Sequence, residues 1–382
     1  MPTADAFEKS LTQTLNIMNK PFSIPQMRPL FGAEEKAELM AYLDEDGFFT
    51  EFKKTEAFEK MIAAYVGAKH CIVVNNGTVS LTLAALALGI GPDDEVIVPN
   101  YTMIATPNSV KMLGAVPVFV DVEPDTLVMD VSLVRAAITH RTKAIMLVSA
   151  NGRAPSAGIN AFEDLSRETG IPLIEDAAQS LGSFYDERHV GRAGAIASLS
   201  FSAPKIISTG QGGALFTDDD ALANKLRRLK DFGRASGGTD VHDSIGYNFK
   251  FTELQACVGL AQMRQLPDRV VRKKVIWKRY REQLEGCRGV RLFEHDLQRC
   301  TPWFIDCMAD DRDGLASHLA EDGIGTRTMY PPINAQKAYQ MKGSFPVSED
   351  VGRRGLWLPS MVQITDVQID EICKSIKRFY GE

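Results

Sequence analysis

The sequence predicts an α/β protein in which a large domain is built on a mainly parallel sheet and a smaller α+β domain follows it. Short apolar runs alternate with helical segments over residues 71–217. These runs are apolar on both faces, which is typical of strands covered by helices on each side. A chain of 382 residues can form two domains. We expect an N-terminal arm at 1–25, a large domain at 26–265, and a linking helix with the small domain at 266–382.

Apolar periodicity places the elements of the large domain. Helical spacing predicts two amphipathic helices at 33–43 and 56–65, and further helices at 81–88 and about 105–113. Gly89 is a suitable stop for the third of these helices. The predicted strands lie at 71–74, 95–98, 116–120, 144–148, 172–174, 197–201 and 213–217.

The C-terminal part begins with a long polar helix, expected over 264–286, that suits a link between two bodies. Beyond it we expect strands at 303–308 and 325–330 and helices at 313–321 and 366–380. The N-terminal arm, in contrast, shows no strong period and contains three prolines.

Composition excludes several classes of function. The formal net charge of -6 and the pI near 5.7 argue against a nucleic-acid or anionic-membrane binder, since those surfaces need a positive field. Six scattered cysteines without a Cys-x-x-Cys pair, and histidines without metal spacing, predict reduced thiols and no metal site. Because we find no signal peptide and no membrane-spanning run, we expect a cytoplasmic protein.

Lys205 is the strongest candidate for chemistry. It lies in the stretch 200–213, between an apolar strand and a glycine-rich turn. A single lysine in a loop is usually a solvated surface charge. Its amine becomes a useful nucleophile when desolvation lowers its pKa, and Phe201, Pro204 and Ile206 could supply the apolar walls.

Two further features support Lys205. The turn at Gly77 and Thr78 joins a strand to a helix and presents free N–H groups at a positive helix end, which suits a phosphate. Taken alone, this turn is more simply explained as a plain glycine turn with Thr78 as the helix cap. Asp176 follows an apolar strand, where ligands of open α/β sheets gather, although it could also cap the next helix. Together the anion turn, the acid and the lysine match the needs of pyridoxal phosphate: a phosphate site, a partner for the ring nitrogen and an amine.

The motifs of the chain resemble a known family. Asn-Gly-Thr at 76–78, Gly-Pro-Asp-Asp-Glu-Val-Ile-Val-Pro at 91–99, Glu-Asp-Ala-Ala-Gln at 175–179, the segment 205–213 and Gly-Tyr-Asn-Phe-Lys-Phe-Thr at 246–252 are similar to those of the DegT/DnrJ/EryC1/StrS sugar aminotransferases, in particular the perosamine-synthase branch. The resemblance covers nearly everything from Arg28 onward. It implies the aspartate-aminotransferase fold, known as fold type I, and pyridoxal 5'-phosphate as the cofactor.

The resemblance also implies residue roles. Lys205 would bind the cofactor covalently and move protons, Asp176 would hold the ring nitrogen, and Gln179 would lie near the phenolic oxygen. The phosphate would be held by Gly77, Thr78 and Ser200, and by Asn248 of a neighbouring subunit, so that a homodimer shares its active sites. Lys250, Arg327 and Tyr330 are candidate substrate contacts, although Arg327 could instead form a structural ion pair.

Several positions depart from the family pattern. Met103 stands where an aromatic ring normally covers the cofactor, and its sulfur can still pack on the ring face. Gln211 replaces a glutamate, Asn334 replaces a histidine, and Phe48–Phe49–Thr50 replaces an entry loop with tryptophan. The usual His-Leu-Tyr-Gly is here Ser-Ala-Asn-Gly at 149–152, followed by Arg153. These departures surround the expected sugar pocket.

The function implied is transfer of an amino group from L-glutamate to a keto carbon of a nucleotide-linked deoxysugar, with C4 as the expected position, for bacterial surface polysaccharide or glycoside synthesis. One alternative is a pyridoxal-dependent sugar dehydratase, but such enzymes carry histidine at the position of Lys205. The other is a non-catalytic protein of the same fold that binds nucleotide-sugars. Neither the nucleotide nor the sugar follows from the sequence.

Overall fold

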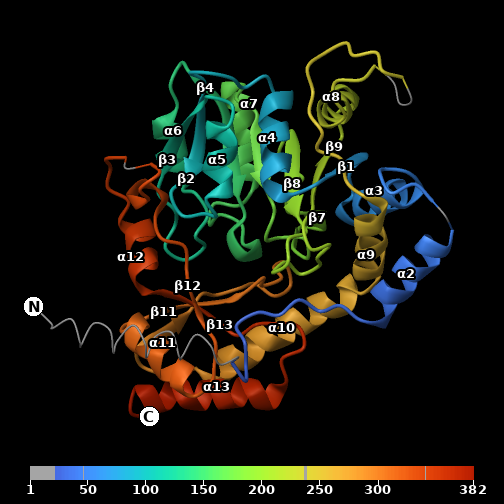
Figure 1. The fold of residues 1–382 in the computed structure, drawn as a ribbon. Helices are drawn as coiled ribbons and strands as arrows, with labels where there is room; N and C mark the ends of the chain where they lie inside the picture. Colours follow the sequence, from blue (N-terminus) through green and yellow to red (C-terminus); the bar gives the residue numbers. More distant parts are fainter. Residues whose placement is uncertain (1–21, 46, 236–238, 340) are drawn as a thin grey trace, which may run out of the picture.

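The computed structural model describes residues 22–45, 47–235, 239–339 and 341–382. Most of the expected N-terminal arm, 1–25, therefore lies outside the described residues. Within the described ranges, two sheets organise the chain (Figure 1). The proposed domain limits at 25 and 265 remain a prediction.

A seven-stranded sheet forms the larger body. Its order is β1-β9-β8-β5-β4-β2-β3. The strands are β1 (His70–Val74), β2 (Glu95–Pro99), β3 (Val116–Val120), β4 (Thr142–Val148), β5 (Leu173–Asp176), β8 (Ile196–Ser200) and β9 (Gly213–Thr217). Strands β3, β2, β4, β5 and β8 pair in parallel, and β9 runs antiparallel to both β8 and β1. The predicted mainly parallel sheet is confirmed.

Helices cover both faces of this sheet (Figure 1), because successive strand residues point to opposite sides. Ile72 and Val74 pack with α4 (Gly77–Ala87), α5 (Ala105–Lys111) and α8 (Asp220–Lys230). Cys71 and Val73 pack on the other face with α3 (Lys53–Val66) and α9 (Glu253–Arg264), and the far half of that face is covered by α6 (Val131–Ala137) and α7 (Asn160–Thr169). Helix α2 (Ala33–Asp44) packs against α9.

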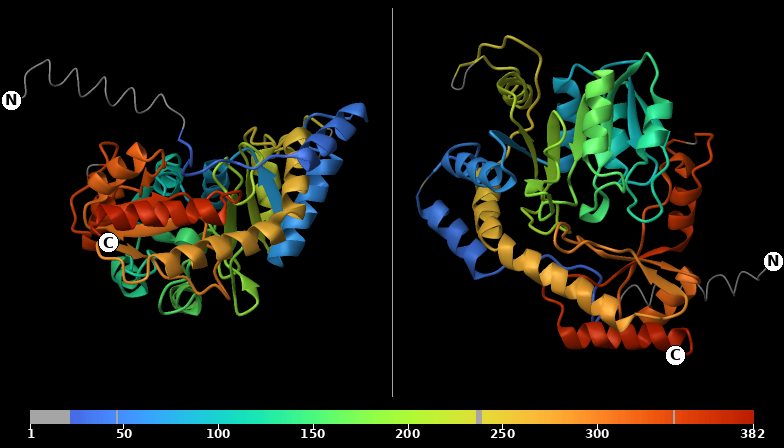
Figure 2. Two further views of the ribbon diagram at one scale, coloured as in Figure 1. Left: turned by 90° about the horizontal axis from the view of Figure 1, so that it is seen from below. Right: turned by 180° about the vertical axis from the view of Figure 1, so that it is seen from behind.

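The linking helix differs from the prediction. A single helix was expected over 264–286, but α9 ends at Arg264 and a separate helix, α10 (Leu266–Gln283), begins two residues later. Pro267 explains the break, because proline fits the first turn of a helix and lacks the N–H that a continuous helix would need. Figure 2 shows α10 running from α9 along the base of the molecule to the second sheet.

The second sheet is four-stranded and antiparallel, in the order β10-β11-β13-β12. Its strands are β10 (Val290–Leu292), β11 (Ile305–Ala309), β12 (Arg327–Thr328) and β13 (Gly355–Leu358). The strand expected at 325–330 is thus wrong in length, because two prolines follow at 331–332 and end the pairing. The accompanying helices are α11 (Arg312–Glu321), α12 (Pro346–Arg354) and α13 (Asp366–Phe379).

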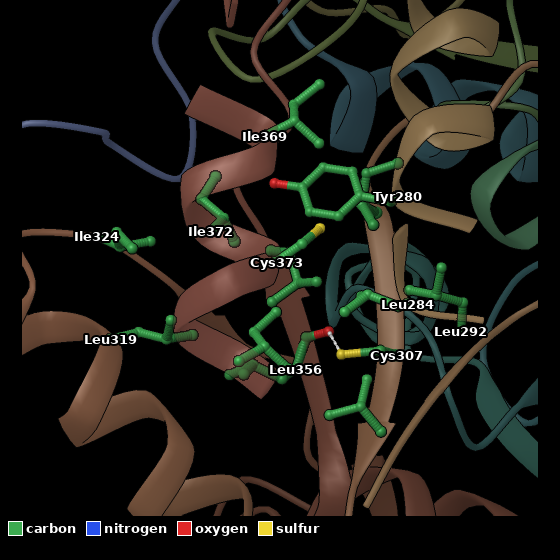
Figure 3. Packing of buried hydrophobic residues seen from close by; sticks show 14 of the residues in the cluster. Tyr280, Leu284, Leu292, Cys307, Leu319, Ile324, Leu356, Ile369, Ile372 and Cys373 are labelled. Atoms are coloured by element: carbon green, nitrogen blue, oxygen red, sulfur yellow. Dashed lines mark hydrogen bonds between the residues drawn. The ribbon is translucent and has the colours of Figure 1, made fainter. Parts of the chain in front are cut away.

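The core of the second sheet is apolar and packed between α10, α11 and α13 (Figure 3). Tyr280 is fully buried among aliphatic side chains, and its hydroxyl donates to the carbonyl oxygen of Pro359 at 2.9 Å. Cys307 is fully buried in this core and contacts the carbonyl oxygen of Leu356 across the β11–β13 pair. No helix in the described part of the chain is long and apolar enough to cross a bilayer.

A buried ion pair joins the two sheets. Arg153, just after β4, contacts Asp306 of β11 at 2.7 Å, and both side chains are buried. Burial opposes ionisation of Asp306, but the guanidinium of Arg153 holds its pKa well below the ordinary range. Burial and the charge of Arg153 lower the pKa of His295, so a neutral imidazole lies 2.9 Å from Nη1 of Arg153.

We predict that Asp306→Asn lowers the free energy of unfolding by about 3–5 kcal/mol at neutral pH, because it leaves the guanidinium of Arg153 buried without its counter-charge. The pKa of Asp306 is depressed in the folded state. Its contribution is therefore present above the ordinary carboxyl pKa of about 4 and is lost as the pH falls below it. The difference in free energy of unfolding between wild type and Asp306→Asn, measured by urea unfolding, should become smaller as the pH is lowered.

Asp164→Asn is the control, since Asp164 pairs with Arg167 on the surface, where an ion pair contributes about 0–1 kcal/mol. Equal stability losses in the two variants, or a loss in Asp306→Asn that does not change with pH, would contradict the assignment.

Candidate active site

Lys205 lies in the connection between β8 and β9. The connection closes on itself, because Phe201 N–H donates to Gly212 O at 2.8 Å and Thr209 N–H donates to Phe201 O at 3.0 Å. The amine of Lys205 lies 4.0 Å from the ring centroid of Trp303. Burial lowers the pKa of Lys205 to about 8, the charge of Asp176 opposes this shift and the charge of Arg327 adds to it. The neutral form of the amine is therefore more accessible near physiological pH than in an exposed lysine.

Asp176 is the last residue of β5, at the carboxyl edge of the parallel strands. Its Oδ2 accepts from the Thr106 hydroxyl at 2.8 Å, and its Oδ1 accepts from Ala178 N–H at 3.2 Å. Thr102 lies 2.9 Å from the same threonine hydroxyl. Burial raises the pKa of Asp176, while these donors and the charge of Lys205 oppose the rise. A cation placed beside this carboxylate would be strongly favoured.

The turn at 76–78 forms the start of α4. Asn76 is the cap, and its Oδ1 accepts from Val79 N–H at 2.9 Å. Gly77 and Thr78 are the first residues of the helix, so their N–H groups have no acceptor within it. Ser200 lies directly against the turn, because a Cβ built on Gly77 would lie 2.9 Å from the Cβ of Ser200. The turn and Ser200 thus form one small polar site.

Gln179 lies beside Ser200 and Lys205. It lines a small cavity with Ser200, Lys205 and Trp303. Its Oε1 accepts from the N–H of Asn151 at 2.7 Å. Four residues of the sequence prediction, namely Lys205, Asp176, Gln179 and Ser200, are therefore gathered at one edge of the sheet, together with Gly77 and Thr78.

Met103, Tyr330 and Arg327 lie around this group. Met103 is 45% exposed and lies between the two threonines that lead to Asp176. The Tyr330 ring packs edge-on against Trp357, with ring centroids 4.7 Å apart. The guanidinium carbon of Arg327 lies 5.4 Å from the ring centroid of the same tryptophan. The charge of Arg327 acts on both Lys205 and Tyr330.

Asn248 and Lys250 are not brought to Lys205 within one chain. Asn248 is exposed and pairs with Asp231 in a short bridge, and the amine of Lys250 forms an ion pair with Asp231 at 2.7 Å. Over the described ranges, no hydrogen bond or ion pair joins either side chain to Lys205 or Asp176.

Two residues of the site were missed in the sequence. Thr106 lies in the first turn of α5, and the hydroxyl of Thr102, which precedes the helix, lies 2.9 Å from the Thr106 hydroxyl. Trp303 lies almost a hundred positions after Lys205, and only the packing of the second sheet against the first brings the two together. Asn151, noted as a departure near the sugar pocket, instead bonds the backbone of Trp303.

The residues present fit pyridoxal phosphate. Gly77 leaves room beside Ser200 that any side chain would fill, and the free N–H groups at the start of α4 suit a phosphate. At the other end of the group, Asp176 is a buried carboxylate without a cation bonded to it among the described residues. Lys205 supplies an amine of lowered pKa. The described residues contain no cluster of three or more histidine, cysteine or acidic side chains that could hold a metal ion.

We predict that Gly77→Ala weakens binding of pyridoxal phosphate about 10- to 100-fold, because the added methyl group would overlap Ser200 and such overpacking costs about 1–3 kcal/mol. The measurement is an absorbance titration of the apoprotein. Gly91→Ala is the matched control, since a Cβ at Gly91 would meet no atom within 4 Å. Equal affinity of both variants would refute the phosphate site.

Comparison with known proteins agrees with this geometry. The family model of the DegT/DnrJ/EryC1/StrS aminotransferase family matches residues 30–377. A GDP-perosamine synthase of Escherichia coli O157:H7 is 36% identical over 363 residues, covering 94% of this chain and 99% of the relative. Among solved structures, S. venezuelae DesV is 32% identical with a TM-score of 0.86, covering 93% of this chain and 99% of its own. The PLP form of Spr1654 from Streptococcus pneumoniae is 25% identical with a TM-score of 0.86, covering 93% and 98%. The expected fold type I is confirmed, and the chain belongs to the DegT/DnrJ/EryC1/StrS aminotransferase family and is a pyridoxal-phosphate-dependent aminotransferase.

Proposed function

We propose that the enzyme transfers an amino group from L-glutamate to a keto carbon, C4, of a nucleotide-linked deoxysugar, with Lys205 as its catalytic residue. The observation that carries this proposal is the placement of the Lys205 amine between the charge of Asp176 and the ring of Trp303. The similarity to GDP-perosamine synthases supports a nucleotide-linked sugar as the amino acceptor. Bacterial surface polysaccharide is the expected destination of the product.

Pyridoxal phosphate, when bound, supplies an aldehyde that reacts with amines and a ring that takes up an electron pair. The residues of the chain do the rest. Gly77, Thr78 and Ser200 would hold the phosphate, and Asp176 would stabilise a positive charge on the ring nitrogen. Lys205 Nζ would accept the proton of the amine-bearing carbon of the amino donor and, in the second half of the reaction, donate a proton to the keto carbon of the acceptor. Its lowered pKa suits this exchange near neutral pH.

Arg327 and Tyr330 are the proposed substrate contacts. Arg327 is exposed and has no ion pair with any described residue, so its guanidinium is free to bind a carboxylate or a phosphate. This position beside Lys205 favours the substrate role over the structural ion pair that the sequence left open. Lys250 is already paired with Asp231 in its own chain, so its proposed substrate contact requires that this pair opens or that a second subunit is present.

The two alternative functions are less well supported. A sugar dehydratase of this type would carry histidine at position 205, and a non-catalytic protein would have no need of a desolvated lysine next to a buried acid. The six cysteines are free and buried, which supports a reducing compartment such as the cytoplasm.

We predict that the purified protein shows a visible absorbance band of lysine-bound pyridoxal phosphate, that L-glutamate bleaches it, and that Lys205→Ala abolishes it. Release of 2-oxoglutarate with a panel of nucleotide-linked keto-sugars should fall by at least about 100- to 10,000-fold in this variant. Lys205→Arg keeps the charge without a nucleophile of suitable pKa and should be equally inactive. Turnover in either variant, or a band that glutamate leaves unchanged, would sink the proposal.

A homodimer with shared active sites is the proposed assembly. The segment that carries Asn248 lies at the outside of the molecule (Figure 1), and Ile245 within it is 81% exposed. Phe48 and Phe49, in the segment before α3, are 68% and 60% exposed. Exposed apolar residues of this size favour a protein partner, and a second copy would bring Asn248 to a phosphate site that it does not reach in its own chain.

Mixing experiments would test the sharing of sites. Lys205→Ala and Asn248→Ala proteins should each have low activity, and a mixture refolded together should recover up to about a quarter of the wild-type activity, because random pairing makes half of the dimers mixed and each mixed dimer has one intact site. No recovery from a mixture shown to contain mixed dimers would mean that each site is built by one chain.

A further inference from the structure

The turn after β4 contacts the site from the side of the second sheet. Asn151 lies in this short 3₁₀ turn (Ala150–Gly152) and is 3% exposed. Its φ of 55° is left-handed, a conformation that asparagine adopts more readily than most residues. Its N–H donates to Oε1 of Gln179 at 2.7 Å. The turn is therefore fastened to the wall of the cavity beside Lys205.

The Asn151 side chain holds the segment that leads into β11. Its Oδ1 accepts from the N–H groups of Trp303 at 2.6 Å and Phe304 at 2.8 Å, and its Nδ2 donates to Phe304 O at 2.9 Å. These three bonds fix the two consecutive residues that precede β11. Replacement by alanine would remove partners from three buried backbone groups, which is costly in a water-excluded site.

Trp303 carries this constraint to the lysine. Its Nε1 donates to Pro204 O at 2.7 Å, one residue before Lys205, and its ring centroid lies 4.0 Å from Lys205 Nζ. Phe304 stacks on Trp303 with ring centroids 3.8 Å apart and an angle of 18° between the rings. Since Trp303 is 4% exposed, its indole closes one side of the amine to water.

We propose that Asn151 is a positioning residue that fixes the indole of Trp303 beside the Lys205 amine, and that this indole is the wall that keeps water from the amine. Arg153, which directly follows this turn, forms an ion pair with Asp306 of β11, three residues after Trp303, and so holds the same part of the chain. The inference rests on the proposed role of Lys205 as the lysine that binds pyridoxal phosphate. The neutral amine is the reactive form, and an amine exposed to water is protonated at neutral pH.

The test measures capture of pyridoxal phosphate by the full-length apoprotein. The adduct is reduced with borohydride and assigned to Lys205 by peptide mass spectrometry, and the initial rate is followed as a function of pH. In Asn151→Ala the midpoint of the pH profile should rise by about one unit or more, so that capture below the midpoint slows about tenfold. Trp303→Ala should shift the midpoint at least as far.

The double variant decides whether the two residues act together. If Asn151 acts through Trp303, the midpoint of the double variant equals that of Trp303→Ala alone. Additive shifts, or an unchanged midpoint in Asn151→Ala, would overturn the inference. Should Asn151→Ala fail to fold, Trp303→Phe keeps a ring and loses the bond to Pro204. Its midpoint should lie between those of wild type and Trp303→Ala, and three equal midpoints would overturn the inference.

Asp121→Ala is the matched control. The Asp121 carboxylate is also buried and accepts from two consecutive backbone N–H groups, those of Val347 at 2.9 Å and Ser348 at 3.0 Å, at the start of α12. It clamps a C-terminal segment to the sheet in the same way but has no contact with Trp303. The midpoint of the pH profile of Asp121→Ala should equal that of wild type. A shift as large as that of Asn151→Ala would show that a general loss of packing causes the effect. Absence of any adduct at Lys205 in wild type would instead refute the proposed function.

Discussion

The ion pair of Arg153 and Asp306 is the constraint on which the relation of the two sheets depends. Two charges without water are stable only when each finds close partners. Here the guanidinium of Arg153 has two further hydrogen-bond partners, Nε2 of His295 and the carbonyl oxygen of Thr126. It also lies 5.2 Å from the ring centroid of Phe293. The pair fixes where β11 enters its sheet relative to the end of β4. The position of Trp303, three residues before Asp306, follows from it.

Burial shifts the pKa values of the two groups of the site in opposite directions. It lowers the pKa of Lys205 and raises that of Asp176, so it favours the neutral form of both, and the charge of each group partly opposes the shift of the other. A positively charged ring nitrogen next to Asp176 would keep that carboxylate ionised without help from the lysine. Bound in this way, the cofactor would complete the electrostatics of the acid and leave the amine free for proton transfer.

Much of this could be predicted from the sequence. The parallel sheet could be predicted because the pattern of strands that are apolar on both faces depends only on local residues. Asp176 and Lys205 could be predicted as site residues because they follow the ends of predicted strands. What depends on packing could not be predicted. Trp303 reaches Lys205 from the segment that precedes β11, and the role of Asn151 in holding its backbone has no sequence signal. Asn248 stays a prediction because one chain does not contain the surface that would test it.

The antiparallel strand β9 has a consequence for motion. Because β9 pairs with β8, both ends of the Lys205 connection are hydrogen-bonded into the same sheet, at Ser200 opposite Gly213. The lysine therefore belongs mechanically to the seven-stranded sheet. The indole that covers it lies two residues before β11 of the four-stranded sheet, and the bonds of Trp303 to Asn151 and Pro204 tie it to the larger body. A rotation between the sheets would have to break these bonds before it uncovered the amine. Opening of the site and placement of its nucleophile are thus mechanically coupled in this fold.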